Sequence, residues 1–278
     1  EGEHKYSKQV LGAAKDLLMN PPELSEVPSR LESQTNERLW QLIMRYKDTD
    51  FANEAAELLV ADSKLNRNAL RYFREVLKGD SVPILAKQYR ESTLDDRGKG
   101  ELYGVINDYI DIHPESGQIL VERFQGYLVK MGEEAIAKAE ADAKREAERA
   151  AREASGEGGG DRGRGGDWRE MFGGGRGGGS RESAVREVRR LTEGKPDTEG
   201  IAARRGILTG LKGSTSDADF QNMFTQVEQR LDALANPDAE GFNERWRLTD
   251  PVRAKQEEER RKRMEEMRDR FRNRGGNN

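Results

Sequence analysis

Residues 36–46 read NERLWQLIMRY, and they open the stretch that decides the fold, which continues to Met131. Its apolar side chains, such as Trp40 and Ile43, recur at three- and four-residue spacing, which is typical of one buried helix face. About five further runs with this spacing follow, separated by short acidic or glycine turns. Roughly 100 residues are enough for a single hydrophobic core. We therefore predict an all-α fold with a compact bundle of about five to six helices over residues 36–131.

Residue types that start and stop helices divide this stretch. Thr35 or Asn36 is placed to cap the first helix, and Asp50 the second, since their side-chain oxygens accept hydrogen bonds from free amides. Gly79 is placed to end the third helix. Pro114 opens the last one, because proline suits the first helical position.

The rest of the chain is predicted to form arms on this bundle, including an extended, partly helical, low-complexity C-terminal arm. Residues 1–35 are a lead-in that either packs on the bundle or docks to another chain. Residues 132–155 form a charged helical extension that is polar nearly all round. Residues 156–180, with 13 glycines, form a Gly/Arg-rich linker. Short helices and aromatic docking motifs follow over 181–249, and a charged C-terminal helix over 250–278.

Ten apolar or aromatic side chains in the arm are candidates for binding another protein. Two aromatic islands lie in otherwise polar sequence, and a helix that Ser216 and Asp217 cap carries a stripe of large residues. A lone helix of that length is marginal in water. We expect it to be buried against the bundle or, preferentially, against a partner subunit. The candidates are Trp168, Met171, Phe172, Phe220, Phe224, Val227, Leu231, Phe242, Trp246 and Leu248.

Composition limits the possible functions. Of the 278 residues, 36% are charged and 34% hydrophobic, so much of the chain lacks the apolar content of a typical globular domain. The net charge of −4 gives no global attraction to nucleic acid or anionic membranes. The absence of cysteine excludes disulfides and thiol catalysis. No apolar run reaches the roughly 18 residues that a membrane span needs.

Neither a metal site nor a catalytic site is predicted. Asp95 to Leu102 partly matches a calcium-binding EF-hand loop, but Arg97 and Lys99 occupy ligand positions, and cations do not bind calcium. The two histidines, His4 and His113, lie in no recognised catalytic motif. We therefore expect a protein that is not an enzyme and has no catalytic, cofactor-binding or metal-binding residues and no cofactor.

The linker gives the one indication of nucleic-acid binding. Residues 162–166 read RGRGG and resemble the arginine-glycine boxes of RNA-binding proteins, and Trp168 and Phe172 could stack on bases. However, residues 156–180 contain four arginines and four acidic residues, so the segment is neutral. RNA-binding segments are usually basic, because neutralising phosphates supplies most of the affinity. A linker is the preferred interpretation.

No motif identifies a family, and the function expected from the sequence is that of a scaffold or linker protein. It would bind and space other protein subunits of a large complex through its helical domain and its arms. The alternative is an RNA- or ribosome-associated protein that uses the Arg/Gly segment and the basic tail, residues 251–278, which carry 10 basic and 6 acidic side chains. The start at Glu1, which processing or an incomplete N-terminus explains, and the lack of cysteine favour a soluble, intracellular, processed organellar protein of a plastid or mitochondrion. They do not fix the compartment.

Overall fold

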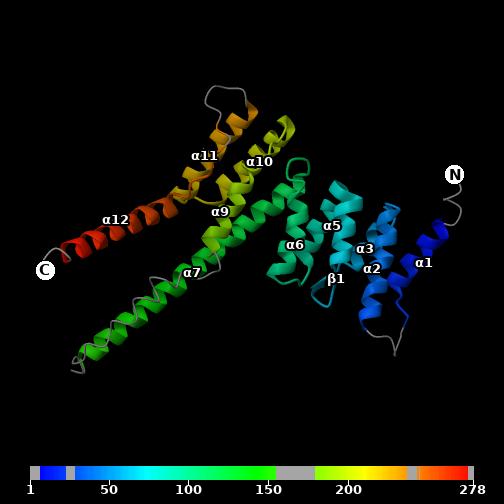
Figure 1. The fold of residues 1–278 in the computed structure, drawn as a ribbon, viewed down its shortest axis with the longest axis horizontal. Helices are drawn as coiled ribbons and strands as arrows, with labels where there is room; N and C mark the ends of the chain where they lie inside the picture. The colour runs from blue at the N-terminus through cyan, green and yellow to red at the C-terminus, as the bar shows by residue number, and fades with distance from the viewer. Residues whose placement is uncertain (1–6, 23–28, 155–178, 237–242, 244, 275–278) are drawn as a thin grey trace. The chain divides into compact units, whose positions relative to one another are not determined.

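The computed structural model describes residues 7–22, 29–154, 179–236, 243 and 245–274, and these are mostly helical (Figure 1). The all-α class is thus confirmed. The strands among these residues are β1 (Val60–Ala61) and β2 (Lys64–Leu65), an antiparallel pair. Residue contacts divide the chain into two compact units, 1–119 and 120–278.

The first unit is a succession of short helices that follow the N-terminal pair α1 and α2 (Figure 1). The neighbouring helices α1 and α2, and likewise α5 and α6, pack against each other. The elements are α1 (Ser7–Met19), α2 (Ser29–Arg45), α3 (Ala52–Glu57), α4 (Arg67–Tyr72), the π-helical turn η1 (Phe73–Leu77), the 3-10 turn η2 (Lys78–Ser81), α5 (Val82–Glu91), α6 (Asp96–Asn107) and the start of α7 (Pro114–Ala154).

An aromatic cluster forms the centre of the first unit. Trp40, Phe51 and Tyr72 have no exposed surface, and their ring centroids lie 5.7 to 6.2 Å apart. The Tyr72 hydroxyl donates a 2.7 Å hydrogen bond to the backbone oxygen of Asp48. Burial raises the pKa of this hydroxyl, and the Asp48 carboxylate raises it further. The phenol therefore remains a proton donor at all physiological pH values.

The N-terminal helix belongs to this unit. Lys15 of α1 forms a 2.7 Å ion pair with Asp48 and lies 5.6 Å from the centroid of the Phe51 ring. Ala14 and Leu18 on the same helix are buried. Of the two interpretations of the lead-in, packing on the neighbouring helices is the one that α1 adopts.

Two of the predicted helix starts are wrong. Thr35 and Asn36 lie inside α2, where the Thr35 hydroxyl donates to the backbone oxygen of Leu31 at 2.9 Å. Because residues 29–45 contain neither proline nor glycine, nothing in the sequence prevents the helix from beginning earlier. Asp50 does not cap α3, which begins without a side-chain cap.

The second unit contains α7 from Leu120 onward together with α9 (Ser180–Arg190), α10 (Thr198–Ser214), α11 (Ala218–Ala235) and α12 (Pro251–Arg274). Its core is built around Phe124 of α7, whose ring centroid lies 5.2 Å from that of Phe220 and 5.9 Å from that of Phe224. All three rings are fully buried.

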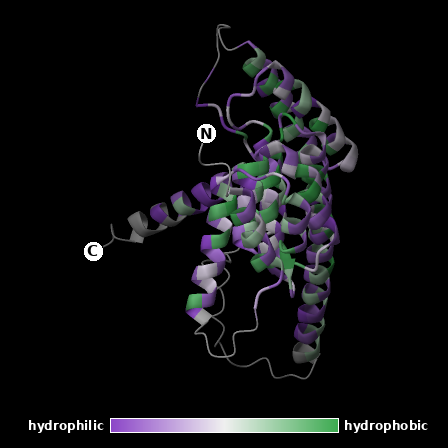
Figure 2. Ribbon diagram, turned by 90° about the vertical axis from the view of Figure 1, so that its right-hand side faces the viewer, coloured by the Kyte–Doolittle hydropathy of each residue, from purple (hydrophilic) through white to green (hydrophobic). Residues whose placement is uncertain are grey.

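Helix α10 approaches α7 closely because it carries a glycine at the crossing. A Cβ atom added at Gly210 would lie 3.2 Å from Cγ2 of Val121, which is tighter than almost all real contacts. The Gln125 amide also donates to the Ser214 hydroxyl at 3.0 Å. The described part of α12 is mostly hydrophilic (Figure 2).

The predicted helix count is therefore wrong, and so is the prediction that everything after the bundle is an arm. Residues 180–235 fold into three helices with a core of their own, and residues 120–131, predicted as part of the first bundle, contribute to it. The reason is that Phe124 packs on α11, which the pattern of a single helix cannot show. Independent folding of residues 36–131 stays a prediction.

An exposed ion pair in the first unit gives a pH-dependent contribution to stability. Arg67 donates to Glu101 through Nη2 at 2.8 Å and Nε at 3.1 Å, and these hydrogen bonds lower the pKa of the Glu101 carboxyl. A lowered folded-state pKa stabilises the fold above the ordinary glutamate pKa of about 4.3. This contribution is lost as pH falls through the folded-state value.

Glu101→Gln should therefore remove part of the acid sensitivity of unfolding. The difference from the natural protein should stay below about 1 kcal/mol, since the pair is largely solvated, and should vanish at acid pH. Denaturant titrations on both sides of the glutamate pKa measure it. Glu91→Gln is the control, because the Glu91 carboxylate lies 4.0 Å from the Lys87 ammonium, which is too far for a hydrogen bond. An equal effect of Glu101→Gln and Glu91→Gln would show that the pair of Arg67 with Glu101 is not the source of this pH dependence.

Candidate functional site

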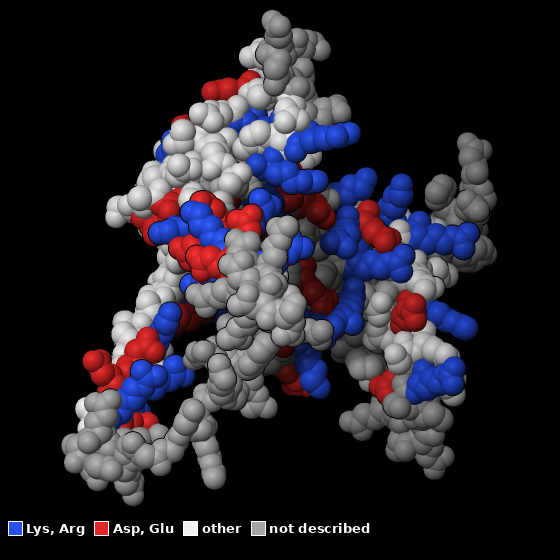
Figure 3. Space-filling view, turned by 60° about the vertical axis from the view of Figure 1, so that its left-hand side comes forward, with Lys and Arg blue, Asp and Glu red and all other residues white. Residues whose placement is uncertain are grey.

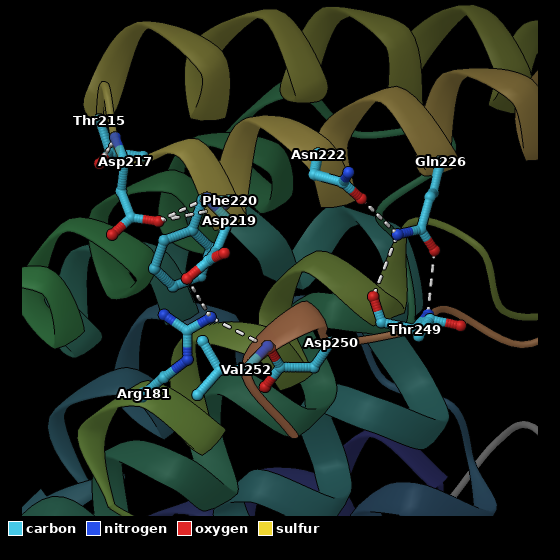
Figure 4. Close-up of polar contacts among 10 residues, drawn as sticks. All are labelled: Arg181, Thr215, Asp217, Asp219, Phe220, Asn222, Gln226, Thr249, Asp250 and Val252. Carbon is cyan, nitrogen blue, oxygen red and sulfur yellow. Dashed lines mark hydrogen bonds and ion pairs between the residues drawn. The ribbon is translucent and has the colours of Figure 1, made fainter. Parts of the chain in front are cut away.

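The most distinctive surface of the second unit lies where α12 begins. Here a short strap, defined as residue 243 and residues 245–250, leads into α12 and lies against α11. The Gln226 side chain of α11 holds it by two hydrogen bonds to Thr249: its amide nitrogen donates to the backbone oxygen at 3.1 Å, and its oxygen accepts from the backbone nitrogen at 3.0 Å (Figure 4). The side-chain amide of Gln226 thus bonds to both backbone polar groups of Thr249 and attaches the strap to α11.

Arg230 of α11 fixes the other end of the strap. Its guanidinium donates to the backbone oxygen of Asn243 at 3.0 Å and lies 5.5 Å from the ring centroid of Trp246. A guanidinium at this distance from an aromatic face is attracted by the ring. Arg230 is buried, so the strap covers a charge that belongs to the helix bundle.

Arg181 of α9 connects three elements at the start of α12. Its Nη2 atom lies 3.0 Å from Oδ1 of Asp250 and 3.7 Å from Oδ2 of Asp219, and its guanidinium lies 5.0 Å from the centroid of the Phe220 ring (Figure 4). Asp250 also accepts a 3.1 Å hydrogen bond from the backbone nitrogen of Val252. These contacts hold the first turn of α12 beside α9 and α11.

A groove of about 390 Å³ opens between α9 and the first turns of α12. We call it the α9–α12 groove. Val185, which is buried, and Val252, which is partly buried, provide its apolar surface. Charged side chains surround them, and basic ones predominate: Arg181, Arg186, Arg189 and Arg253 against Glu182 and Asp250.

The arginines of the groove differ in how far they are neutralised. Arg181 is paired with Asp250, and Arg253 has Glu257 at 3.3 Å. Arg186 and Arg189 are exposed and form no ion pair with any residue that the structure describes. The space-filling view shows basic and acidic side chains interspersed, with groups of adjacent basic side chains among them (Figure 3). The groove therefore presents uncompensated positive charge beside an apolar patch.

Four predicted partner-binding residues are not on a surface in this structure. Phe220, Phe224, Val227 and Leu231 have no exposed area, and α7, α9 and α10 of the same chain surround α11. The sequence favoured a partner subunit as the surface that buries this helix, whereas in this structure helices of the same chain bury it. Besides Phe124 of α7, its cover comes from α9 with the following Leu191 and from α10, which together bury eight apolar side chains, namely Ala184, Val185, Val188, Leu191, Ile201, Ile207, Leu208 and Leu211.

The remaining predicted residues fall into two groups. Leu248 is buried in the strap and Trp246 is half-buried there, so the second aromatic island is partly used within the chain. Trp168, Met171, Phe172 and Phe242 lie outside the described residues, as does the Arg/Gly segment. Their proposed roles stay predictions.

The EF-hand-like segment begins a helix. Asp95 caps α6 by accepting a 2.7 Å hydrogen bond from the backbone nitrogen of Gly98. Among the described residues, no group of three or more His, Cys, Asp or Glu side chains is placed to hold a metal ion. No helix within the same ranges is both long and apolar enough to cross a membrane.

Sequence reasoning missed Arg181, Gln226 and the buried charges Glu187, Arg204 and Arg230, although three of them could have been noticed. Each buried charge occupies a position of the apolar stripe of its helix: Glu187 lies between Ala184 and Val188, for example. A charge at such a position is unusual unless a partner compensates it. Arg204 finds its partner at the end of α9, donating to the Leu191 carbonyl at 3.2 Å.

Comparison with known proteins gives no relative from which a function could be inferred. No family model, curated protein or solved structure matches the chain significantly.

The strap should loosen when its hydrogen bonds to α11 are removed. Gln226→Ala deletes both bonds to Thr249, each of which contributes about 0.5–1.5 kcal/mol. In a background with Trp40→Phe and Trp168→Phe, Trp246 is the sole tryptophan. Its emission should move to longer wavelength and its quenching by acrylamide should increase. Trp40 Nε1 has no hydrogen-bond partner among the described residues, so the background change loses no such bond.

Thr225→Ala is the matched control for this experiment. Thr225 lies beside Gln226 on α11, is exposed and bonds only to its own helix, at the Gln221 oxygen. It should leave the emission of Trp246 unchanged. Identical spectra for Gln226→Ala and the background would show that these hydrogen bonds do not hold the strap.

Proposed function

We propose that this protein is a non-catalytic scaffold or linker that binds other proteins and holds them at a fixed spacing within a larger assembly. The observation that carries the proposal is the exposed part of α7. All residues from Gly132 to Ala151 are exposed, and at 1.5 Å per residue this run is about 30 Å long. Glu134, near the start of this run, accepts a 2.6 Å hydrogen bond from the Ser180 hydroxyl, and a helix that stays exposed while it extends a folded unit is suited to spacing.

Helix α12 supports the proposal as a second exposed arm. Residues 253–266 are all exposed, and ion pairs along the helix, such as the 2.7 Å pair of Lys262 with Glu258, stabilise it locally. The strap and Arg181 attach its first turn to α9 and α11, so it leaves the second unit at a defined point. One unit thus carries two helical arms with different charge patterns.

Cross-linking of the full chain, purified natively from its source, tests the proposal. Lysine-reactive cross-links from α7 (Lys138, Lys144) and from α12 (Lys255, Lys262) should reach other proteins, and each arm should have its own partners. Nuclease treatment should leave these links intact. Links that stay within the chain would contradict a scaffold role, and partners that nuclease releases would favour the RNA- or ribosome-associated alternative.

A deletion within α7 tests the spacing role separately from binding. Removing residues 140–146 takes out about two helical turns, or roughly 10 Å, while nearly preserving the angular position of the remaining turns of the helix. If α7 is a spacer, partners bound near its two ends should come closer together or one of them should be lost. The exchange Glu140→Gln, which keeps the length and both cross-linking lysines of α7, should change neither.

A further inference from the structure

We propose that the α9–α12 groove is a docking site for an acidic segment of a partner protein, one that carries an apolar side chain among its carboxylates. The inference rests on the proposed scaffold function, since it gives the chemical nature of one partner. It is derived from the charges, the apolar patch and the fixed walls of the groove.

Two exposed arginines of the groove form no ion pair with a described residue. Arg186 and Arg189 are three residues apart on α9, so their side chains are neighbours on the helix surface. Neither forms an ion pair with a described residue, and like charges so placed repel each other. Carboxylates that bind between them remove this repulsion. Arginine is well suited to this, because its planar guanidinium donates to both oxygens of a carboxylate at once.

The walls of the groove are already held in position. Arg181 with Asp250 and Gln226 with Thr249 attach the start of α12 to α9 and α11 independently of any ligand. On the α12 side, Arg253 lines the groove opposite the arginines of α9. A preformed site loses little conformational freedom when a ligand binds, which favours affinity for a short segment.

The lining distinguishes an acidic peptide from a nucleic acid. Val252, together with the small exposed part of Val185, gives the groove an apolar patch that a side chain such as leucine can cover, whereas a phosphate backbone offers nothing to bury there. Glu182 on the rim and Glu257 beside Arg253 would repel a strand that carries one negative charge per nucleotide. A peptide can place its carboxylates at the arginines and neutral residues at these two glutamates.

The test uses the full chain and a fluorescent synthetic peptide of glutamates with two leucines. The double variant Arg186→Glu, Arg189→Glu should weaken binding at physiological ionic strength by at least about tenfold, the loss of one or two charge-assisted hydrogen bonds. Arg263→Glu with Arg268→Glu changes the net charge equally, but these exposed residues lie roughly 15 and 22 Å along α12 from Arg253, beyond the Debye length of about 8 Å, and should reduce binding less than about twofold. Replacing the leucines of the peptide by serine should also weaken binding.

Three results would overturn the proposal. An equal loss in both double variants would show general electrostatic attraction. Tighter binding of an oligouridylate of the same charge, abolished by Arg186→Glu with Arg189→Glu, would assign the groove to RNA. Equal affinity for the leucine and serine peptides would remove the apolar patch from the site.

The same variants separate this proposal from the scaffold function. If Arg186→Glu with Arg189→Glu leaves every native cross-link to other proteins unchanged, the groove is not a docking site although the protein remains a scaffold. If the peptide binds as expected but α7 and α12 give no links to other proteins, the groove stands and the scaffold role fails. Circular dichroism of each variant must match the natural protein, so that unfolding does not account for a loss of binding.

Discussion

Phe124→Ala is expected to destabilise the second unit by about 3–5 kcal/mol, the usual cost of emptying a buried aromatic site. The Phe124 ring is fully buried and lies edge-on to both Phe220 and Phe224, so its removal leaves a cavity between α7 and α11. Most of a typical domain's stability of roughly 5–15 kcal/mol could be lost. Hydrogen exchange of the amides of α9, α10 and α11 on the full chain measures the effect.

The control for this variant lies on the same helix. Val129→Ala removes an apolar side chain that is 63% exposed and should change stability by no more than about 0.5 kcal/mol. If α9, α10 and α11 keep their protection in Phe124→Ala, these helices are stable without α7. The second unit would then begin at Ser180 rather than at Leu120.

Glu187→Ala should lower the free energy of unfolding by a similar amount, about 3–5 kcal/mol, although it removes no large apolar surface. Glu187 is 2% exposed and holds two arginines, with Arg123 Nε 3.1 Å from Oε1 and Arg190 Nε 3.1 Å from Oε2. Without the carboxylate, the largely buried Arg123 loses its counter-charge and lies near a second cation. Denaturant unfolding of the full chain measures the loss.

Two further variants show whether charge is the cause. Arg123→Met combined with Glu187→Leu replaces the main pair by apolar groups and should recover much of the stability, as buried ion pairs often allow. Glu182→Ala removes a carboxylate from the exposed side of α9, where only its interaction with the helix dipole, about 0.3–1 kcal/mol, is lost. A double variant no more stable than Glu187→Ala would mean that packing at this position, and not the buried charge, dominates.

The buried charges also explain why this unit has one arrangement of its helices. Glu187 joins α9 to α7, Arg204 joins α10 to the end of α9, and Arg230 joins α11 to the strap. Each of these groups would be left without its partner if its helix slid or rotated, which costs several kcal/mol for a buried charge. We therefore interpret the three charges as determinants of register.

Local features of the fold could be predicted from the sequence because their causes are local. Helical spacing of apolar residues predicted the all-α class and the position of α11. The cap at Asp217 is confirmed, since its carboxylate accepts hydrogen bonds from the backbone nitrogens of Asp219 at 2.9 Å and Phe220 at 3.1 Å. Caps at Thr35 and Asp50 failed because α2 begins earlier, at Ser29, and α3 begins without a side-chain cap.

The candidate site was the part that sequence reasoning recovered least. The sequence showed that the apolar stripe of α11 must be buried, but it did not show which surface buries it. The stripe consists of Phe220, Phe224, Val227 and Leu231. The α9–α12 groove joins side chains about 70 positions apart, such as Arg181 and Asp250. No periodicity within one helix contains that information.

The sequence by itself thus determined which segments are helical and which of their faces are apolar, because backbone hydrogen bonding and side-chain spacing act over a few residues. Only the tertiary structure decided that α7 from Leu120 covers α11, and that the strap brings the start of α12 to α9. Burial is non-directional, so an apolar stripe accepts any complementary surface. The choice among surfaces depends on contacts such as the Phe124 ring and the Glu187 carboxylate, which exist only once distant segments have met.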